Sequence, residues 1–325
     1  MDLRKLFIND HGRLRSVWRL LFFLFTYIAI YLLLSTVLRL AYAALYPLVD
    51  RIPHANFLAD IVFRLNIVGS ALLAGYVSNR FLEGLPWSAL GLTLHKRWFH
   101  DLCVGSLVGA VSLAIAALIA TVGGGLQFTA SSRGMLVAVA QTLFSAVALF
   151  IIAALAEEAL FRGYPLQTLC RAKLGWLGVL MTSLPFAMIH FGNPNIGPFA
   201  VANTALAGIW LGIAYLRTRS LWFPLGVHWA WNWALGPLFG LPVSGLNLFS
   251  HPVLQGKDLG PAWLTGGNYG IEGGAACTVA LLLSTIFIWR THLVSADPEL
   301  KKLTSEENPA TPSAVIPILR ADEQI

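Results

Sequence analysis

The residues best suited to chemistry form three short clusters in or beside long apolar runs. The first holds Glu157, Glu158 and Arg162. A carboxylate at the centre of a bilayer costs about 2.5–3.5 kcal/mol on insertion scales, so an ionisable residue there is a candidate for function. On a helix, Glu158 and Arg162 stand four residues apart in the order that favours an ion pair, whereas Glu157 points about 100° away. We therefore expect Arg162 to neutralise Glu158, which leaves Glu157 able to take up or release a proton.

The other two clusters add imidazoles, an aromatic ring and an amide. Phe186 and His190 are one helical turn apart in FAMIH, so they share a helix face. His228 and Asn232 are related in the same way in HWAWN, in the middle of an apolar run. Together they can offer two hydrogen-bond donors to one oxyanion. A carboxylate, two histidines and an asparagine on three apolar helices supply a base, an electrophile and oxyanion donors.

Each cluster also has an explanation without catalysis. The two glutamates can mark the cytoplasmic end of a span, and His190 alone can be an interfacial residue. His228 and Asn232 can join two helices by hydrogen bonds. Asp60 and Arg64, four residues apart in another span, are best explained as a self-neutralised pair that makes insertion cheaper. The presence of all three clusters in one chain favours a catalytic function over these separate explanations.

The composition predicts a polytopic, all-α membrane protein. Of 325 residues, 57% are hydrophobic and 12% are charged, with a mean hydropathy of +0.69; a soluble domain has about 25% charged residues. The net charge of +6 comes from scattered basic residues, which excludes a nucleic-acid partner. The three cysteines lie far apart and form neither a disulfide framework nor a metal-binding pattern.

Runs long enough to cross a bilayer predict about eight transmembrane helices. They cover residues 17–38, 57–77, 102–122, 134–156, 174–189, 199–216, 221–241 and 275–289. The first run exceeds the hydrophobic region of a signal peptide and is expected to be an uncleaved anchor. Small residues at four-residue spacing, Gly105 with Gly109 and Gly208 with Gly212, predict close helix packing.

The chain divides into four segments along its length. Residues 1–16 form a basic cytoplasmic N-terminus, 17–133 the N-terminal membrane helices, 134–293 the catalytic membrane core, and 294–325 a polar, proline-punctuated tail that we expect to be disordered. Within the core, the Gly/Pro-rich stretch from 240 to 274 is expected to be an outer loop.

The ordered set E-E-x-x-x-R, F-x-x-x-H and H-x-x-x-N resembles the CPBP group of intramembrane proteases. This group includes the type II CAAX prenyl endopeptidases and bacteriocin-processing or immunity proteins, also called the Abi group. The motif positions in this chain are Glu157, Glu158, Arg162, Phe186, His190, His228 and Asn232. The phrases FRGYPLQTL and GGNYGIEGG also resemble bacterial members.

The resemblance implies peptide-bond hydrolysis inside the membrane, in an all-helical fold with a cavity open to the cytosol. It implies that Glu157 activates water with His190 and that His228 and Asn232 hold the oxyanion. Glu158, Arg162 and Phe186 would orient these groups. The substrate would be a peptide or protein, with lipid modification left open, and the protein would reside in the lipid bilayer of a bacterial inner membrane.

The resemblance also leaves zinc open as a cofactor, because the group is often catalogued with the metalloproteases. His190, His228 and Glu157 would then supply the three ligands that a catalytic zinc normally requires. Such a site would use Glu157, the obvious general base, as a metal ligand. A carboxylate in a low-dielectric cavity has a pKa raised towards neutrality, as a general base needs, so we expect a glutamate-activated water and no obligatory zinc.

Two other classes of function remain alternatives. A proton-coupled transporter can use the same glutamates and histidines as a relay, although the chain shows no repeat of two similar halves. A membrane binding or immunity protein can hold a peptide in the cavity without cutting it.

Catalysis also requires the apolar run that ends at 156 to continue as a helix through LFRGYPLQTL. Otherwise Glu157 lies at the opposite end of its span from His190. We expect Pro165 to kink this extended helix.

The basic residues predict that both termini are cytoplasmic. Of the 22 Lys and Arg residues, only Arg39, Arg51, Arg133 and Lys257 fall on the other side of the membrane, and Arg64 lies within a span.

A membrane-impermeant thiol reagent applied from the periplasmic side should therefore label Lys257→Cys and miss Lys301→Cys. The parent chain gives the background from its native cysteines. The reverse labelling pattern would overturn the orientation.

Overall fold

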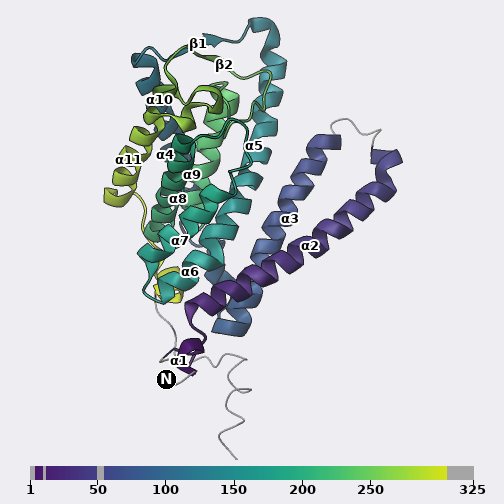
Figure 1. Cartoon of the computed structure of the whole chain (residues 1–325), viewed down its shortest axis with the longest axis vertical. Helices are drawn as coiled ribbons and strands as arrows, with labels where there is room; N and C mark the ends of the chain where they lie inside the picture. The colour runs from purple at the N-terminus through teal and green to yellow at the C-terminus, as the bar shows by residue number, and fades with distance from the viewer. Residues whose placement is uncertain (1–3, 10–11, 50–54, 306–325) are drawn as a thin grey trace, which may run out of the picture. The chain divides into compact units, whose positions relative to one another are not determined.

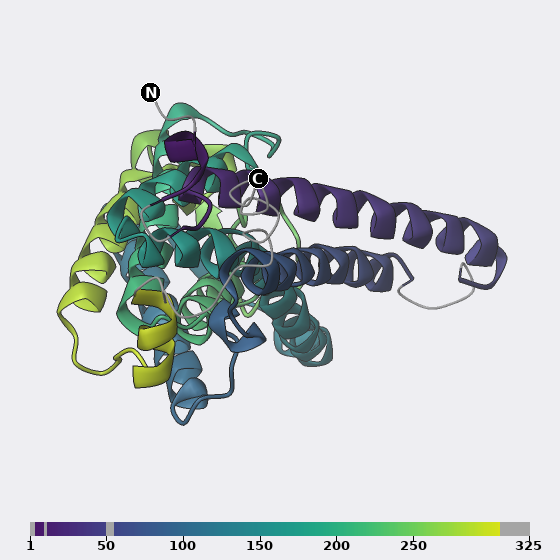
Figure 2. The same cartoon turned by 90° about the horizontal axis from the view of Figure 1, so that it is seen from below.

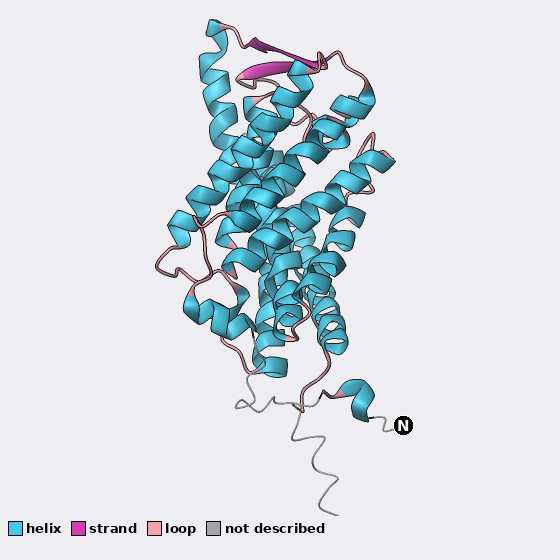
Figure 3. Ribbon diagram, turned by 90° about the vertical axis from the view of Figure 1, so that its left-hand side faces the viewer, coloured by secondary structure: helices cyan, strands magenta, loops and turns pink. Residues whose placement is uncertain are grey.

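The computed structural model describes residues 4–9, 12–49 and 55–305. Helices dominate this part of the chain, and its strands form one antiparallel pair (Figure 3). Five helical segments are long and apolar enough to cross a membrane: Ser16–Pro47, Phe57–Glu83, Trp98–Val122, Leu136–Arg171 and Pro198–Thr218. The prediction of an all-α polytopic membrane protein is confirmed.

Three of the expected spans are helices of less than full membrane length. They are α7 (Gly175–Met188), α9 (Trp222–Trp233) and α11 (Ala275–Arg290), with 14, 12 and 16 residues. A single helix needs about 20 residues to cross the hydrocarbon core. A π turn at Ala234–Leu238 (η5) extends α9. All the expected apolar runs are therefore helical, although the helices differ in length.

The described residues belong to two compact units, each assembled from segments that are far apart in the chain. Unit 1 comprises Met1–Thr93, Leu155–Gly178 and Pro298–Ile325, and unit 2 comprises Leu94–Ala154 and Val179–Asp297. The four segments predicted from the sequence stay a prediction.

Unit 1 is built on two long helices that pack against each other, α2 and α3 (Figures 1 and 2). Its elements are α1 (Arg4–Phe7), α2 (Ser16–Val49), α3 (Ala55–Ser78), η1 (Asn79–Glu83), η2 (Trp87–Leu90), η4 (Ala159–Gly163), α6 (Tyr164–Arg171) and α12 (Pro298–Ser305). Its core joins Phe23 of α2, Ala74 of α3, Leu90 of η2 and Tyr164 of α6. The Phe23 and Tyr164 rings stack with centroids 5.3 Å apart.

Unit 2 packs α4 (Trp98–Val122) against α9, and α8 (Pro198–Thr218) against α11. Two strands, β1 (Leu126–Ala130) and β2 (Leu254–Asp258), pair antiparallel with Leu126 opposite Asp258. The remaining elements are η3 (Arg133–Met135), α5 (Leu136–Glu158), which ends in unit 1, α10 (Ala262–Thr265), η6 (Gly267–Tyr269) and η7 (Ile271–Gly273).

Close backbone contact between α4 and α9 depends on glycine. A Cβ added at Gly105 would lie 2.3 Å from the Phe223 carbonyl oxygen, and one at Gly109 would lie 2.1 Å from that of Val227. On α8, a Cβ added at Gly208 would lie 2.7 Å from Ser183 Cβ of α7, and one at Gly212 would lie 2.9 Å from Val179 Cγ1. Small residues allow such an approach between membrane helices. The packing role predicted for these glycines is confirmed.

The helix that carries the two glutamates continues beyond them, as catalysis requires. Residues Leu136–Arg171 form one apolar helical segment, made of α5, the π turn η4 and α6. The irregularity lies directly before Pro165, which is the second residue of α6. Proline has no N–H to donate to the carbonyl four residues earlier, and a π turn is one way to accommodate that loss.

Part of the tail is ordered, so the prediction of disorder is wrong for residues Pro298–Ser305. These residues form α12, and they pack against α6 and η2. The reason is amphipathicity, because Leu300 and Thr304 share one helix face and are both buried. Residues 306–325, to which the rest of that prediction applies, lie outside the described residues.

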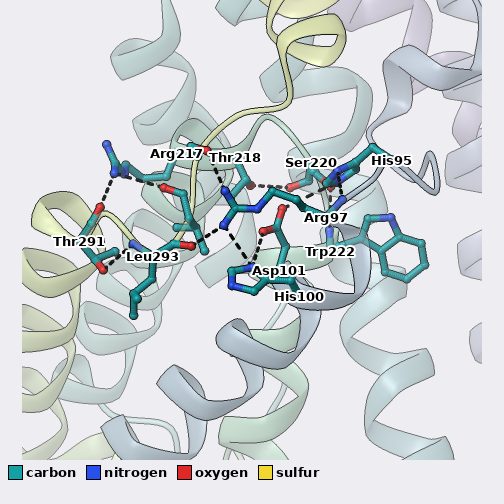
Figure 4. Close-up of polar contacts among 12 residues, drawn as sticks. His95, Arg97, His100, Asp101, Arg217, Thr218, Ser220, Trp222, Thr291 and Leu293 are labelled. Atoms are coloured by element: carbon teal, nitrogen blue, oxygen red, sulfur yellow. Dashed lines mark hydrogen bonds and ion pairs between the residues drawn. The ribbon is translucent and has the colours of Figure 1, made fainter.

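A polar network in unit 2 holds the segment that follows α11 (Figure 4). Arg97, at the start of α4, donates to the Leu293 carbonyl at 2.7 Å, and Arg217 of α8 donates to the Thr291 carbonyl at 2.5 Å. Buried Asp101 lies beside His95 and His100, at 3.7 Å and 3.3 Å. Segments far apart in sequence are thus joined at the ends of α4, α8 and α11.

We expect Gly109→Ala to destabilise the protein, because the added methyl group meets the Val227 carbonyl. Overpacking of this kind costs about 1–3 kcal/mol. The matched control is Gly69→Ala, since Gly69 lies inside α3 with nothing within 4 Å of an added Cβ. That control should be neutral or slightly stabilising. Thermal unfolding in detergent measures both, and equal melting temperatures would contradict the role of the glycine.

Candidate functional site

The glutamate pair of unit 1 lies at the end of α5, directly before the π turn. The Arg162 guanidinium donates to a Glu158 carboxylate oxygen at 3.1 Å, and both side chains are fully buried. Glu157 is only partly buried, and its carboxylate also attracts Arg162. The predicted ion pair between Glu158 and Arg162 is confirmed. Burial differs between the two residues, because Glu158 is fully enclosed whereas Glu157 is partly exposed as a residue, with one carboxylate oxygen buried.

The π turn η4 sets where Arg162 points. It spans Ala159–Gly163 and widens the helix immediately after Glu158, while the ion pair still closes across four residues. A π turn inside an α-helix is uncommon and often occurs at functional sites. The sequence signal was Pro165, which we interpreted as the cause of a kink.

A second buried charge network anchors the glutamate helix within unit 1. The Glu83 carboxylate accepts from Arg19 at 2.9 Å and from the Thr168 hydroxyl at 2.9 Å, and it also pairs with Arg171. Glu83 ends η1, Arg19 lies in α2, and the other two lie in α6. All four side chains are buried. The network therefore fixes α6, and with it the helix that bears Glu158.

In unit 2, one aromatic ring brings the two predicted histidines together. The centroid of the Phe186 ring lies 5.1 Å from that of His190 and 6.1 Å from that of His228. Phe186 is near the end of α7, His190 is in the turn after it, and His228 is in α9. The shared face expected for Phe186 and His190 is confirmed. Placing His228 against that face required the packing of two helices.

The His190 imidazole has a defined orientation. Its Nδ1 lies 2.8 Å from the Phe186 carbonyl oxygen. A carbonyl can only accept, so Nδ1 carries the hydrogen and the neutral ring presents the lone pair of Nε2. Within the described residues, Nε2 has no hydrogen-bond partner. His190 can thus accept a proton or a hydrogen bond through Nε2.

Asn232 follows His228 by one turn of α9, so the two side chains share a helix face. His228 is 8% exposed and Asn232 is partly buried. Among the described residues, the Asn232 amide makes no side-chain hydrogen bond. An amide on a partly buried face is available to a ligand group.

Glu272 is a further acidic residue near His190, and the motif analysis gave it no role. Its carboxylate accepts hydrogen bonds from the indole of Trp231 at 3.0 Å and from the backbone N–H of Ser244 at 2.6 Å. The only sequence signal is a lone acid within the glycine-rich GGNYGIEGG. Asp60 and Arg64, in contrast, form a simple pair at 2.8 Å, as predicted.

The residues of either unit fit zinc poorly. Within the described part of each unit, no three His, Cys, Asp or Glu side chains gather in a way that could hold a metal ion. A catalytic zinc site takes three protein ligands. Unit 2 offers His190 near Glu272, whose carboxylate already accepts hydrogen bonds from Trp231 and Ser244. We therefore derive no step through a metal.

Glu158→Gln should unfold the protein at a much lower temperature than Glu157→Gln. The first change leaves the Arg162 charge buried beside a neutral amide, and breaking a buried pair costs about 3–5 kcal/mol. The double variant Glu158→Gln with Arg162→Gln should recover part of the loss, because both charges are gone. Thermal unfolding in detergent checks this order. Equal stability of the two single variants would show that the pair is unimportant.

Comparison with known proteins identifies the region that holds these motifs. Residues 138–234 match the family described as type II CAAX prenyl endopeptidase Rce1-like. An uncharacterized 24.3 kDa protein of Escherichia coli is 35% identical over 101 residues, which cover 30% of this chain and 45% of that protein. The chain thus matches less than half the length of this relative. No solved structure matches the chain.

The family match includes every motif position from Glu157 to Asn232. It confirms the resemblance that the ordered motifs predicted, over the residues that it covers. Together with the long apolar helices, it indicates an integral membrane protein. Over residues 138–234, this chain is similar to the Rce1-like type II CAAX prenyl endopeptidases.

Proposed function

We propose that this protein is an intramembrane endopeptidase that hydrolyses a peptide bond with a water molecule activated by Glu157. The observation that carries the proposal is the contact of His190 and His228, from separate segments, with the one ring of Phe186. Two imidazoles held against a common ring, with Asn232 one turn away, form an arrangement suited to acyl transfer.

Glu157 is the general base in this proposal. Its carboxylate takes a proton from water while the water oxygen attacks the carbonyl carbon of the substrate. Pairing of the fully buried Glu158 with Arg162 supports this division, because Glu157 is the partly exposed residue of the two. General-base catalysis by a positioned side chain contributes about 10²–10⁴-fold.

His190 helps to hold the attacking water. Its Nδ1–H is committed to the Phe186 carbonyl, so the lone pair of Nε2 can accept a hydrogen bond from the water. The proton that Glu157 takes from the water can pass through this nitrogen to the leaving amine. The bond to Phe186 and the ring contact keep the imidazole in that orientation.

His228 and Asn232 stabilise the oxyanion that forms when the carbonyl is attacked. Both are potential donors on one face of α9, and His228 is buried, which strengthens its hydrogen bonds. Collapse of the tetrahedral intermediate breaks the C–N bond, and the proton taken from water passes to the amine. Glu158, Arg162 and Phe186 orient these groups.

The substrate in this proposal is a peptide or protein segment, either with or without a lipid. The protein itself lies in a bacterial inner membrane with both termini in the cytoplasm. A non-proteolytic binding protein and a proton-coupled transporter are the alternatives that an activity assay separates.

Glu157→Gln, His190→Ala and His228→Ala should each lower peptide cleavage by about 10²-fold or more, because each removes the base or a contact to the transition state. The assay is purified protein in detergent with a panel of quenched peptides, prenylated and unprenylated. Asp258→Asn is the matched control, since this exposed carboxylate lies in β2.

Near-normal turnover by Glu157→Gln would disprove the assignment of the base. The same assay with a tight chelator tests the metal alternative. Activity that is lost on chelation and restored by zinc, with one zinc per protein, would replace this mechanism with one in which His190 and His228 are ligands.

A further inference from the structure

Two buried amides in unit 1 have no hydrogen-bond partner among the described residues. They belong to Asn79, the first residue of η1, and to Gln167 of α6. Both residues are 0% exposed, and the nitrogen and the oxygen of each amide are unpaired within the described part of the chain. An amide offers two N–H donors and an oxygen with two lone pairs. Buried side chains of this kind almost always bond to protein or to ordered water.

The surroundings of these amides supply no bulk solvent. Asn79 lies in the apolar segment Phe57–Glu83 and Gln167 in the apolar segment Leu136–Arg171, and both segments are long enough to cross a membrane. Hydrocarbon cannot hydrogen-bond a polar group, so polar groups within a span must be satisfied inside the protein. The partner of the two amides must therefore be enclosed with them.

Contacts on either side bracket the two amides at the interface of α3 and η1 with α6. At one end, a Cβ added to Gly75 of α3 would lie 3.3 Å from the Tyr164 Cβ. At the other end, Glu83 of η1 accepts from the Thr168 hydroxyl at 2.9 Å and pairs with Arg171. Residue numbers rise in the same direction on both sides of the interface, so the two segments run parallel.

The spacing puts Asn79 and Gln167 at the same level of this interface. Asn79 is midway along its own segment, four residues from each bracketing contact. Gln167 shares one face of α6 with Tyr164 and Arg171, which are three residues before it and four after it. Both amides therefore lie between the two contacts that hold the segments together.

Water fits this place better than an ion does. The charged groups beside the amides already neutralise one another, because the Glu83 carboxylate pairs with Arg19 at 2.9 Å and also with Arg171. Uncharged amides present both donors and acceptors. This suits a water molecule, since a buried water typically makes about three hydrogen bonds to otherwise unsatisfied groups.

We propose that Asn79 and Gln167 line an internal hydration site between η1 and α6, where ordered water bonds to both amides. The water supplies the partners that the described residues do not, and it links the end of α3 to the helical segment that carries Glu157 and Glu158. The site takes no part in the proposed hydrolysis, so it stands whether or not the protein cuts peptides.

The first test detects the water by radiolytic labelling and mass spectrometry of the protein in detergent. Hydroxyl radicals formed from a bound water oxidise the side chains beside it. Tyr164 is the reporter, since it is 1% exposed and lies one helical turn from Gln167. Phe223, which is 0% exposed in unit 2, gives the background for a buried ring. We expect Tyr164 to be oxidised above this background, after correction for the intrinsic reactivity of the two rings.

The same measurement on the double variant Asn79→Leu with Gln167→Met assigns the water to the two amides. Both changes keep side chains of similar size and remove every amide donor and acceptor. Oxidation of Tyr164 should fall by at least about twofold, because a buried water needs polar partners, while that of Phe223 stays unchanged. A rate that the double variant does not lower would overturn the inference. So would a wild-type Tyr164 at background, which needs no variant to fold and is the result expected if the amides bond directly to each other.

Thermal unfolding in detergent gives a second, independent sign. Gln167→Met removes one partner of the water, leaves Asn79 in place, and should lower the melting temperature by about 2 °C or more. An amide buried without water is a cost to the folded state, so its removal would instead raise the melting temperature. Gln255→Met is the matched control, because Gln255 is exposed in β2, and it should have a smaller effect. A melting temperature of Gln167→Met at or above that of wild type would overturn the inference.

Discussion

The requirement that every buried charge have a counter-charge governs the arrangement of this protein. Moving an ion out of water is expensive, and only a close, well-bonded partner offsets that cost. Unit 1 meets this requirement twice, with Arg162 on Glu158 and with Arg19 and Arg171 on Glu83. The second network ties α2, η1 and α6 together, and the first lies on the same continuous helix. Charge neutralisation therefore also sets the position of the helix on which the chemistry is proposed.

The same requirement distinguishes the two adjacent glutamates. Glu158 is enclosed with its arginine, whereas Glu157 is only partly buried at the next position of the helix. Unit 2 contributes two further groups. The Nδ1 of His190 is hydrogen-bonded to a backbone carbonyl, and the Asn232 amide makes no side-chain hydrogen bond among the described residues. The proposed hydrolase combines Glu157 with His190 and Asn232.

Close packing fixes the positions of these side chains. Glycines at the α4 and α9 contact bring the backbones together, and the Phe186 ring fills the space between two imidazoles. Asn203 of α8 holds the backbone on both sides of Glu272, because its amide nitrogen donates to the carbonyls of Glu272 and Gly274. The family match covers the motifs on α5 to α9 and ends at residue 234, so Glu272 lies outside it.

The sequence by itself predicted the features that depend on the periodicity of a single helix. The apolar runs, the Glu158 and Arg162 pair, the shared face of Phe186 and His190, and the close-packing glycines all depend on spacings of three to four residues, which helix geometry alone determines. Pro165 likewise predicted an irregularity in this helix. The prediction was a kink, whereas the structure has a π turn. The Glu83 network, the contact of His228 with Phe186, and the contacts of Glu272 with Trp231 and Ser244 join residues dozens of positions apart. Only the packing of one element on another decides such contacts, because no local rule relates the partners. The helix α12 shows the same limit, since a polar tail became ordered by burying Leu300 against neighbours that its own sequence does not specify.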